Sequence, residues 1–168
     1  MKTIVIGVDG SPQAERALRR GLEEALRFEL DALVVHAWLP TPYSAGIPWM
    51  GVTFPALVQE HIEADRKAVS EELERRVAWI QGEEKATAVD VRCRTREGLP
   101  APILLEEAAN AHTLVVGARG HGGFVGLLLG SVSDQCVRHA PCPVLVVPAP
   151  DDGSGPPPGT RLPQQLER

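Results

Sequence analysis

Apolar and polar residues follow two patterns along the chain, one typical of strands and one typical of helices. Four short runs are continuously apolar and rich in β-branched residues, as in strands buried on both faces of a parallel sheet. These runs are residues 3–8, 32–38, 114–116 and 143–147. Between residues 89 and 95, apolar residues alternate instead with charged ones, which predicts a half-exposed strand at a sheet edge.

Helical periodicity fills the intervals between these runs. Ser11 is a candidate N-cap with Pro12 at the first helical position, and apolar residues then recur at spacings of three and four as far as Leu26. Similar patterns predict three further helices, over residues 58–80, over residues 103–110 and from Ser131 onward. Strands that alternate with helices, without hairpin signals, predict an α/β fold: a parallel sheet with helices on both faces, joined by right-handed crossovers.

The chain has 168 residues, which is enough for one domain with a single large core. We expect this domain to span residues 1–148. Residues 149–168 are rich in proline and glycine and have no apolar periodicity, so we expect a flexible tail. Residues 40–55 combine prolines, glycines and aromatic residues, which predicts a loop that either closes over a ligand or is an idle surface excursion.

Charge and composition narrow the possible partners. The net charge of −5 argues against non-specific nucleic-acid binding. Arg16, Arg19, Arg20 and Arg27 cluster, but glutamates are interleaved with them, so we expect a solvated helix face. The sequence has no apolar stretch close to the ~20 residues that span a bilayer and no signal-peptide pattern. Its three cysteines lack CxxC spacing, and we expect a cytoplasmic protein without a nucleic-acid or membrane partner.

The most informative stretch passes from the strand at 114–116 through a glycine-rich loop to the helix that begins near Ser131. The glycines of this stretch are Gly117, Gly120, Gly122, Gly123 and Gly130. Because glycine has no Cβ and accepts a positive φ, the backbone can curl tightly here and bring N–H groups close to a ligand. The first turn of the helix adds unpaired N–H donors and the positive end of the helix dipole, and Ser131 adds a hydroxyl. The stretch therefore predicts a site for a phosphate chain.

Asp9 directly follows the first strand and is a candidate partner of the glycine loop. Ligands of open parallel sheets bind beyond the carboxyl ends of the strands, where the winding direction reverses. If the first and fourth strands are neighbours, Asp9 faces the loop, where it could bond a ribose hydroxyl or an adenine amine or help to hold a metal ion. The alternative is a turn aspartate that bonds its own backbone. The sequence contains no P-loop motif, and no GxGxxG motif follows the first strand.

The spacing Gly-x2-Gly-x9-Gly-Ser, from Gly117 to Ser131, resembles that of the universal stress protein family. The resemblance covers nearly all of residues 1–148 and includes VDGS, VVHAW, VVGARGHGG and LLLGSVSDQCVRHAPCPVLVV. It implies a Rossmann-like sandwich of five parallel strands in the order 3-2-1-4-5, with adenine-nucleotide binding in the subgroup that keeps the glycine motif. It also implies a homodimer formed through the last strand, Val144–Val147.

The resemblance further implies which residues bind the nucleotide, which we expect to be ATP with Mg²⁺. The residues that would border adenine and ribose are Gly7, Val8, Asp9 and Ala37. Those that would wrap ribose and phosphates are Val116, Gly117, Ala118, Arg119, Gly120, His121 and Gly122. Those that would bind phosphates at the helix start are Gly130, Ser131, Val132 and Ser133. Asp9 is the candidate Mg²⁺ ligand, either directly or through a water molecule.

His36 lies in an apolar strand, where we expect a hydrogen-bonded structural role, whereas His121 lies in the phosphate loop and is expected to contact the ligand. Neither histidine has the neighbours of a nucleophilic triad, so we assign no catalytic residue. The leading hypothesis is an ATP-binding stress-response module that acts on an unidentified protein partner. The alternatives are a slow ATPase or AMP-forming enzyme at the same site, and a dimeric interaction module whose nucleotide is structural.

Overall fold

The computed structural model describes residues 3–39, 55–120 and 128–148. The predicted loop at 40–55 and the predicted tail at 149–168 fall almost wholly outside these ranges, and both stay predictions.

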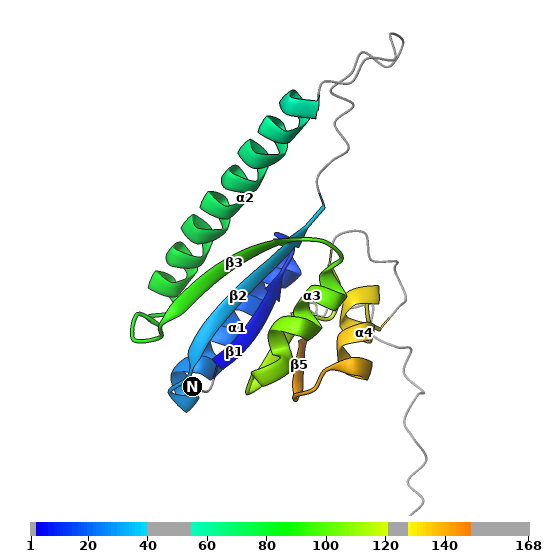
Figure 1. Ribbon diagram of the computed structural model, residues 1–168. Helices are drawn as coiled ribbons and strands as arrows, with labels where there is room; N and C mark the ends of the chain where they lie inside the picture. Colours follow the sequence, from blue (N-terminus) through cyan, green and yellow to red (C-terminus); the bar gives the residue numbers. More distant parts are fainter. Residues whose placement is uncertain (1–2, 40–54, 121–127, 149–168) are drawn as a thin grey trace, which may run out of the picture.

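Five parallel strands form one sheet in the order β3-β2-β1-β4-β5 (Figure 1). The strands are β1 (Thr3–Val8), β2 (Asp31–Trp38), β3 (Val91–Glu97), β4 (Thr113–Gly117) and β5 (Val144–Val147). The fold class and the strand order that the sequence predicted are confirmed. The central strand, β1, pairs in parallel with β2 on one side and with β4 on the other.

Helices cover both faces of the sheet. One face packs against α1 (Pro12–Phe28) and α2 (Pro55–Glu83). The other packs against α3 (Pro100–Glu107), the short 3₁₀ helix η1 (Ala108–Asn110) and α4 (Ser131–His139). We call these two sides the α1–α2 face and the α3–α4 face.

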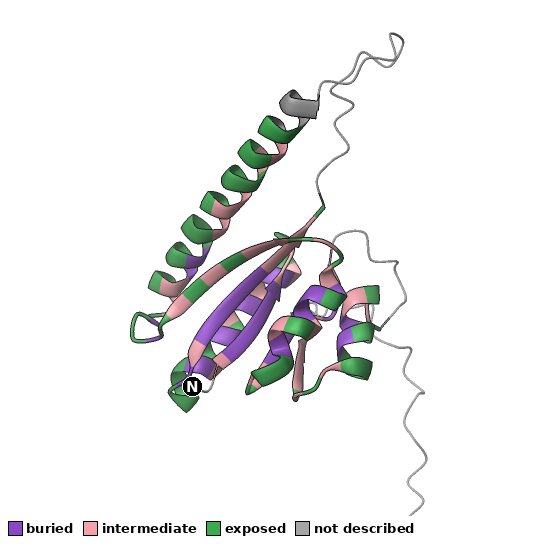
Figure 2. Cartoon of the chain, viewed as in Figure 1, coloured by how far each residue is buried: buried purple, intermediate pink, exposed green. Residues whose placement is uncertain are grey.

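Each face has its own apolar core, and the central strands lie between the two cores (Figure 2). Ile6 and Leu22 are fully buried in the core of the α1–α2 face, and Leu114 and Cys136 are fully buried in that of the α3–α4 face. Successive residues of a strand point to opposite faces, so a strand buried on both sides must be apolar throughout. The continuous apolar runs in the sequence follow from this.

Element boundaries differ slightly from those predicted. The α1 helix begins as expected, because Ser11 Oγ accepts a hydrogen bond from the Ala14 N–H at 3.1 Å and Pro12 occupies the first turn. The edge strand β3 begins at Val91 instead of residue 89. The backbone of Val89 belongs to a turn: its N–H donates to Ala86 O at 3.0 Å, and its carbonyl oxygen accepts from the Gln81 side chain at 2.9 Å.

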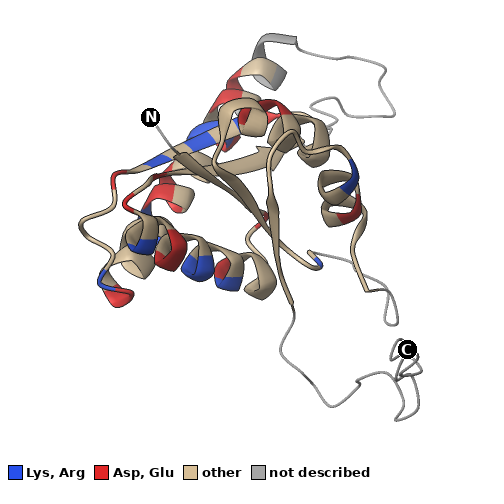
Figure 3. Cartoon of the chain, turned by 90° about the horizontal axis from the view of Figure 1, so that it is seen from below, with Lys and Arg blue, Asp and Glu red and all other residues tan. Residues whose placement is uncertain are grey.

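Ion pairs join α1 to α2. The Arg19 guanidinium lies 3.0 Å from Glu15 in α1 and 2.6 Å from Glu84, which follows α2. The hydrogen bond from Arg19 holds the pKa of Glu15 below its usual value. Acidic and basic residues alternate along the helices in Figure 3, and Glu15, one of the glutamates interleaved in the arginine cluster, pairs with Arg19. None of the described helices is both long and apolar enough to cross a membrane.

Candidate functional site

The carboxyl ends of β1 and β4 lie side by side, at the place where the sequence predicted a ligand site. The two strands are parallel neighbours, with Ile4 opposite Thr113 and Ile6 opposite Val115. From β1 the chain winds outward through β2 to β3, and it then crosses over to β4 and β5 on the other side. The winding direction therefore reverses between β1 and β4, which is the usual ligand position in open α/β sheets.

Asp9 begins the turn that joins β1 to α1. Its Oδ1 accepts a hydrogen bond from the backbone N–H of Ser11 at 3.0 Å. Gly10, between them, has a φ of 81°, a left-handed conformation that favours glycine. The interpretation of Asp9 as a turn aspartate is therefore correct for one of its carboxylate oxygens.

The other carboxylate oxygen of Asp9 lies against the glycine loop. A Cβ on Gly120 would overlap Asp9 Oδ2. Two segments more than a hundred residues apart in sequence thus meet at the end of the sheet, as expected if β1 and β4 are neighbours. Glycine at 120 makes this close approach possible.

Close packing, and not an unusual backbone conformation, accounts for Gly117 and Gly120. A Cβ on Gly117 would lie 3.0 Å from Arg119 O and 3.3 Å from Gln13 O, which is tighter than ordinary contact. Gly117, Gly120 and Gly130 all have φ outside the left-handed region. The expectation that these glycines supply positive φ is therefore wrong for these three positions. At Gly117 and Gly120 it is the lack of space for a side chain that favours glycine, whereas a Cβ on Gly130 would make ordinary contacts.

The described chain resumes just before α4. Gly130 is the N-cap, its N–H donates to Ala118 O at 2.7 Å, and no side chain caps the helix within the described residues. The first helical bond runs from the Asp134 N–H to Gly130 O at 2.9 Å. The preceding N–H groups, at residues 131–133, have no backbone partner in the part of the chain that is described. Unpaired N–H groups at the start of a helix are the kind of donor to which anions bind in other proteins.

Ser133 ties the loop to this helix. Its side chain is 2% exposed, and its hydroxyl lies 2.7 Å from Ala118 O and 3.0 Å from Gly130 O, where it can donate to either carbonyl. Ala118 also donates its N–H to Val147 O at 2.7 Å, which links the loop to β5. Because the Ser133 hydroxyl is engaged in this way, its backbone N–H is the group that remains for an anion.

The strand ends next to the loop provide an apolar wall on the α3–α4 face. A Cβ on Gly7 would lie 2.8 Å from Leu104 Cδ1 and 3.3 Å from Val116 Cγ1, so Leu104 of α3 fills the space beside Gly7. Ala37, near the end of β2, packs into the same core as Val116. His36 lies on the opposite face, and its Nδ1 is 2.9 Å from Val8 O. The predicted structural role of His36 is confirmed.

The family model for universal stress proteins matches residues 1–148. The chain belongs to the universal stress protein family. A curated universal stress protein of Mycolicibacterium smegmatis is 38% identical over 144 residues, which cover 86% of this chain and 45% of that relative. The chain thus spans about half the length of the curated relatives it matches.

Solved universal stress proteins share the fold. The UspA protein of Lactobacillus plantarum superposes with a TM-score of 0.68 at 20% identity, covering 87% of this chain and 97% of the other. A universal stress protein solved in complex with cAMP superposes with a TM-score of 0.59 at 28% identity, covering 87% of this chain and 95% of the other.

Arg16 is a residue near the glycine loop that the sequence did not single out as part of the site. Arg16 has two guanidinium nitrogens, Nε and Nη2, that are buried without a hydrogen-bond partner among the described residues, and Arg119 Nε is in the same state. Arg16 lies one turn beyond Gln13, whose carbonyl oxygen packs beside Gly117. The expectation of a solvated helix face, made because glutamates are interleaved with the arginines, is therefore wrong for these two nitrogens of Arg16. His121 and Gly122 lie outside the described residues.

Proposed function

We propose that this universal stress protein binds an adenine nucleotide, ATP together with Mg²⁺, in the crevice between β1 and β4. The start of α4 carries the proposal, because its N–H groups at 131–133 precede the first helical bond and Gly130 stands at the N-cap. A phosphate chain is the ligand chemistry that such an uncapped helix start favours. The 28% identical relative solved with cAMP, itself an adenine nucleotide, supports the choice of base.

The adenine and ribose would lie beside the strand ends. Gly7, Ala37 and Val116 lie near the carboxyl ends of three adjacent strands on the α3–α4 face, and the base would lie beyond these strand ends, against their apolar surroundings. Asp9 follows β1 and meets Gly120, and in this arrangement it would bond a ribose hydroxyl. In this arrangement the sugar meets Asp9 and the phosphates extend along Gly117, Ala118, Arg119 and Gly120 to Ser131, Val132 and Ser133.

Asp9 is also the residue we propose for Mg²⁺. Among the described residues, no group of three or more His, Cys, Asp or Glu side chains could hold a metal ion. Mg²⁺ at nucleotides commonly takes one or two carboxylates and completes its shell with phosphate oxygens and water. A single carboxylate beside the phosphate loop fits this donor set, and the Ser11 N–H keeps that carboxylate in place.

Substitution of Gly130 by alanine tests the position of the phosphates. A Cβ at this residue would lie 3.5 Å from Arg119 Cα and 3.6 Å from Ala118 O, which is ordinary contact. The fold should therefore tolerate the change, with at most about 1 kcal/mol lost at the N-cap. The added methyl group would occupy space beside the phosphates, and we expect calorimetric titration to show ATP affinity reduced about tenfold. Wild-type protein that binds ATP no better than millimolar, or a variant that binds equally well, would contradict the proposal.

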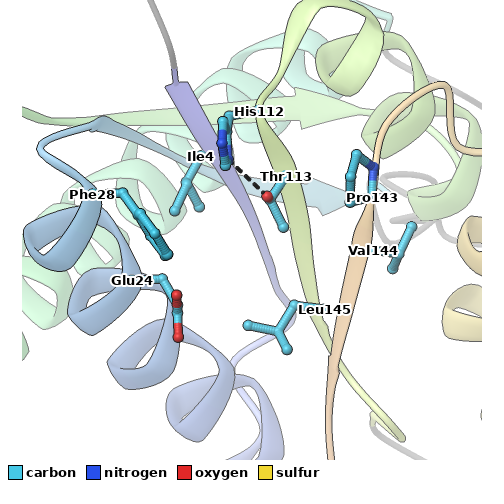
Figure 4. A pocket seen from close by; sticks show the side chains of 8 residues that line it. All are labelled: Ile4, Glu24, Phe28, His112, Thr113, Pro143, Val144 and Leu145. Atoms are coloured by element: carbon cyan, nitrogen blue, oxygen red, sulfur yellow. Dashed lines mark hydrogen bonds between the residues drawn. The ribbon is translucent and has the colours of Figure 1, made fainter.

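We further propose that the nucleotide regulates a cytoplasmic stress-response module, and that the module is a homodimer joined through β5. β5 pairs with β4 along one side, and all four of its residues are partly exposed. A hollow of about 290 Å³ beside it is lined by Ile4, Phe28 and Leu145, among others (Figure 4). Phe28 is 53% exposed there, so a partner strand would cover apolar surface.

Sedimentation equilibrium tests the dimer. It should give twice the 18.1 kDa mass of the chain, and a monomer at micromolar concentration would refute the dimer.

A further inference from the structure

A second cavity opens between α1 and α2, over the carboxyl ends of β1 and β2. Its volume is about 570 Å³, within the usual range for small-molecule sites. The walls are mainly aliphatic, with Leu18 of α1 facing Val69, Leu73 and Val77 of α2. A cavity of this size and lining can accommodate an apolar body of one or two rings.

This cavity lies on the other side of the sheet from the proposed nucleotide wall. Gly7, Ala37 and Val116 border the α3–α4 face, whereas the cavity is built on the α1–α2 face. The two regions meet only at the end of β1, where Val8, Gly10 and Ser11 line the cavity. A ligand in the cavity therefore need not compete with a nucleotide in the crevice.

Polar groups on the same face of the sheet lie at the bottom of the cavity or beside it. His36 lines the cavity, and its Nδ1, 2.9 Å from Val8 O, must carry the proton to bond that carbonyl. In the neutral ring, Nε2 is then a hydrogen-bond acceptor. The hydrogen bond to Val8 thus makes His36 Nε2 a hydrogen-bond acceptor toward a ligand.

Thr95 and Trp38 lie on the same face of the sheet as His36 but do not line the cavity. Thr95 is the register partner of His36 in β3, and Trp38 lies two residues beyond His36 in β2, on the same face. Thr95 Oγ1 and Trp38 Nε1 are buried and have no hydrogen-bond partner among the described residues. Buried polar atoms without a partner are rare in proteins, so these two atoms mark a polar environment next to the cavity.

The charged residues at the rim are already paired. Glu15 pairs with Arg76 across the mouth and with Arg19 at 3.0 Å, and Glu72 pairs with Arg75 at 2.6 Å. A charged ligand would have to break these pairs or leave its own charge without a partner. The rim therefore favours a neutral ligand.

We propose that this α1–α2 cavity is a second binding site, for a neutral amphipathic small molecule. Its apolar body lies between Leu18 and Leu73, and an O–H or N–H group donates to His36 Nε2. The site is independent of the proposed nucleotide function, so either can fail without the other.

Calorimetric titration with 1-naphthol, which has a two-ring apolar body and one O–H donor, tests the proposal. Ala68 lines the cavity from an exposed position on α2, so Ala68→Trp fills the space without disturbing the core. Ala64→Trp is the matched control, one turn earlier on the same helix, exposed and outside the lining. We expect saturable one-to-one binding by the wild type, weakened about tenfold or more by Ala68→Trp and changed less than about twofold by Ala64→Trp.

His36→Asn tests the polar contact. The asparagine amide can still donate to Val8 O, but it lacks the acceptor at the Nε2 position, so 1-naphthol affinity should fall about fivefold or more. AMP at saturating concentration should leave 1-naphthol binding unchanged. The proposal is wrong if 1-naphthol binding is not saturable, if both tryptophan variants bind like the wild type, if His36→Asn has no effect, or if AMP displaces the probe.

Discussion

Replacement of Gly120 by alanine should reduce nucleotide affinity about tenfold or more and destabilise the fold by about 1–3 kcal/mol. The added Cβ would overlap Asp9 Oδ2, so either the carboxylate or the loop must move. The φ of Gly120 is outside the left-handed region, and the penalty therefore comes from this overlap and not from backbone strain. Movement of Asp9 also disturbs its hydrogen bond with the Ser11 N–H at the start of α1.

Gly82→Ala is the matched control for this substitution. Gly82 lies in α2, and a Cβ there would meet no atom within 4 Å. Alanine in a helix is favoured over glycine by about 0.5–1 kcal/mol, so the control should unfold at slightly higher urea concentration and bind ATP like the wild type. Equal ATP affinity in Gly120→Ala and Gly82→Ala would show that the contact between Asp9 and Gly120 has no part in binding.

Leu104→Ala should lower the free energy of unfolding by about 2–5 kcal/mol. Leu104 is 4% exposed, and its Cδ1 would lie only 2.8 Å from a Cβ on Gly7. Removal of this side chain leaves a void between α3 and β1, directly beside the proposed adenine wall. Urea denaturation monitored by circular dichroism measures the loss.

Leu99→Ala is the control for that measurement. Leu99 immediately precedes α3 and is 62% exposed, so its truncation should change stability by no more than about 0.5 kcal/mol. If Leu104→Ala cost less than about 1 kcal/mol, the close packing of α3 against Gly7 would not be a feature of the protein in solution.

The sheet could be predicted from the sequence because its central strands are buried on both sides. The buried parts of β1 and β2 are therefore apolar, and β3, at the edge, alternates apolar with charged residues. The cap at Ser11 was also predictable, because serine followed by proline is a local signal. The start of β3 was not, since the backbone of Val89 is used by a turn that depends on the distant Gln81 side chain.

The candidate site could be predicted in outline but not in its contacts. Spacing and glycine content located the loop, and the strand order brought Asp9 to it. The hydroxyl of Ser133 is used to hold Ala118, a bond to a carbonyl that no local pattern marks. The α1–α2 cavity was not predicted. The apolar residues that line it follow the same helical spacing as residues that pack in a core, so the sequence does not distinguish the two. The sequence predicted a structural role for His36. The proposed role of its Nε2 as an acceptor for a ligand follows only from the cavity that His36 lines.

An amide NMR titration of the wild-type protein with ATP and Mg²⁺ tests the central claim most directly. Binding in the crevice predicts that the largest shift changes occur at Asp9, at Gly117 and Gly120, and at the α4 residues Ser131 and Ser133. The residues of the α1–α2 cavity, such as Leu73, should change little. Shift changes concentrated in that cavity or elsewhere, or none up to millimolar ATP, would contradict the proposal that this universal stress protein binds a nucleotide between β1 and β4.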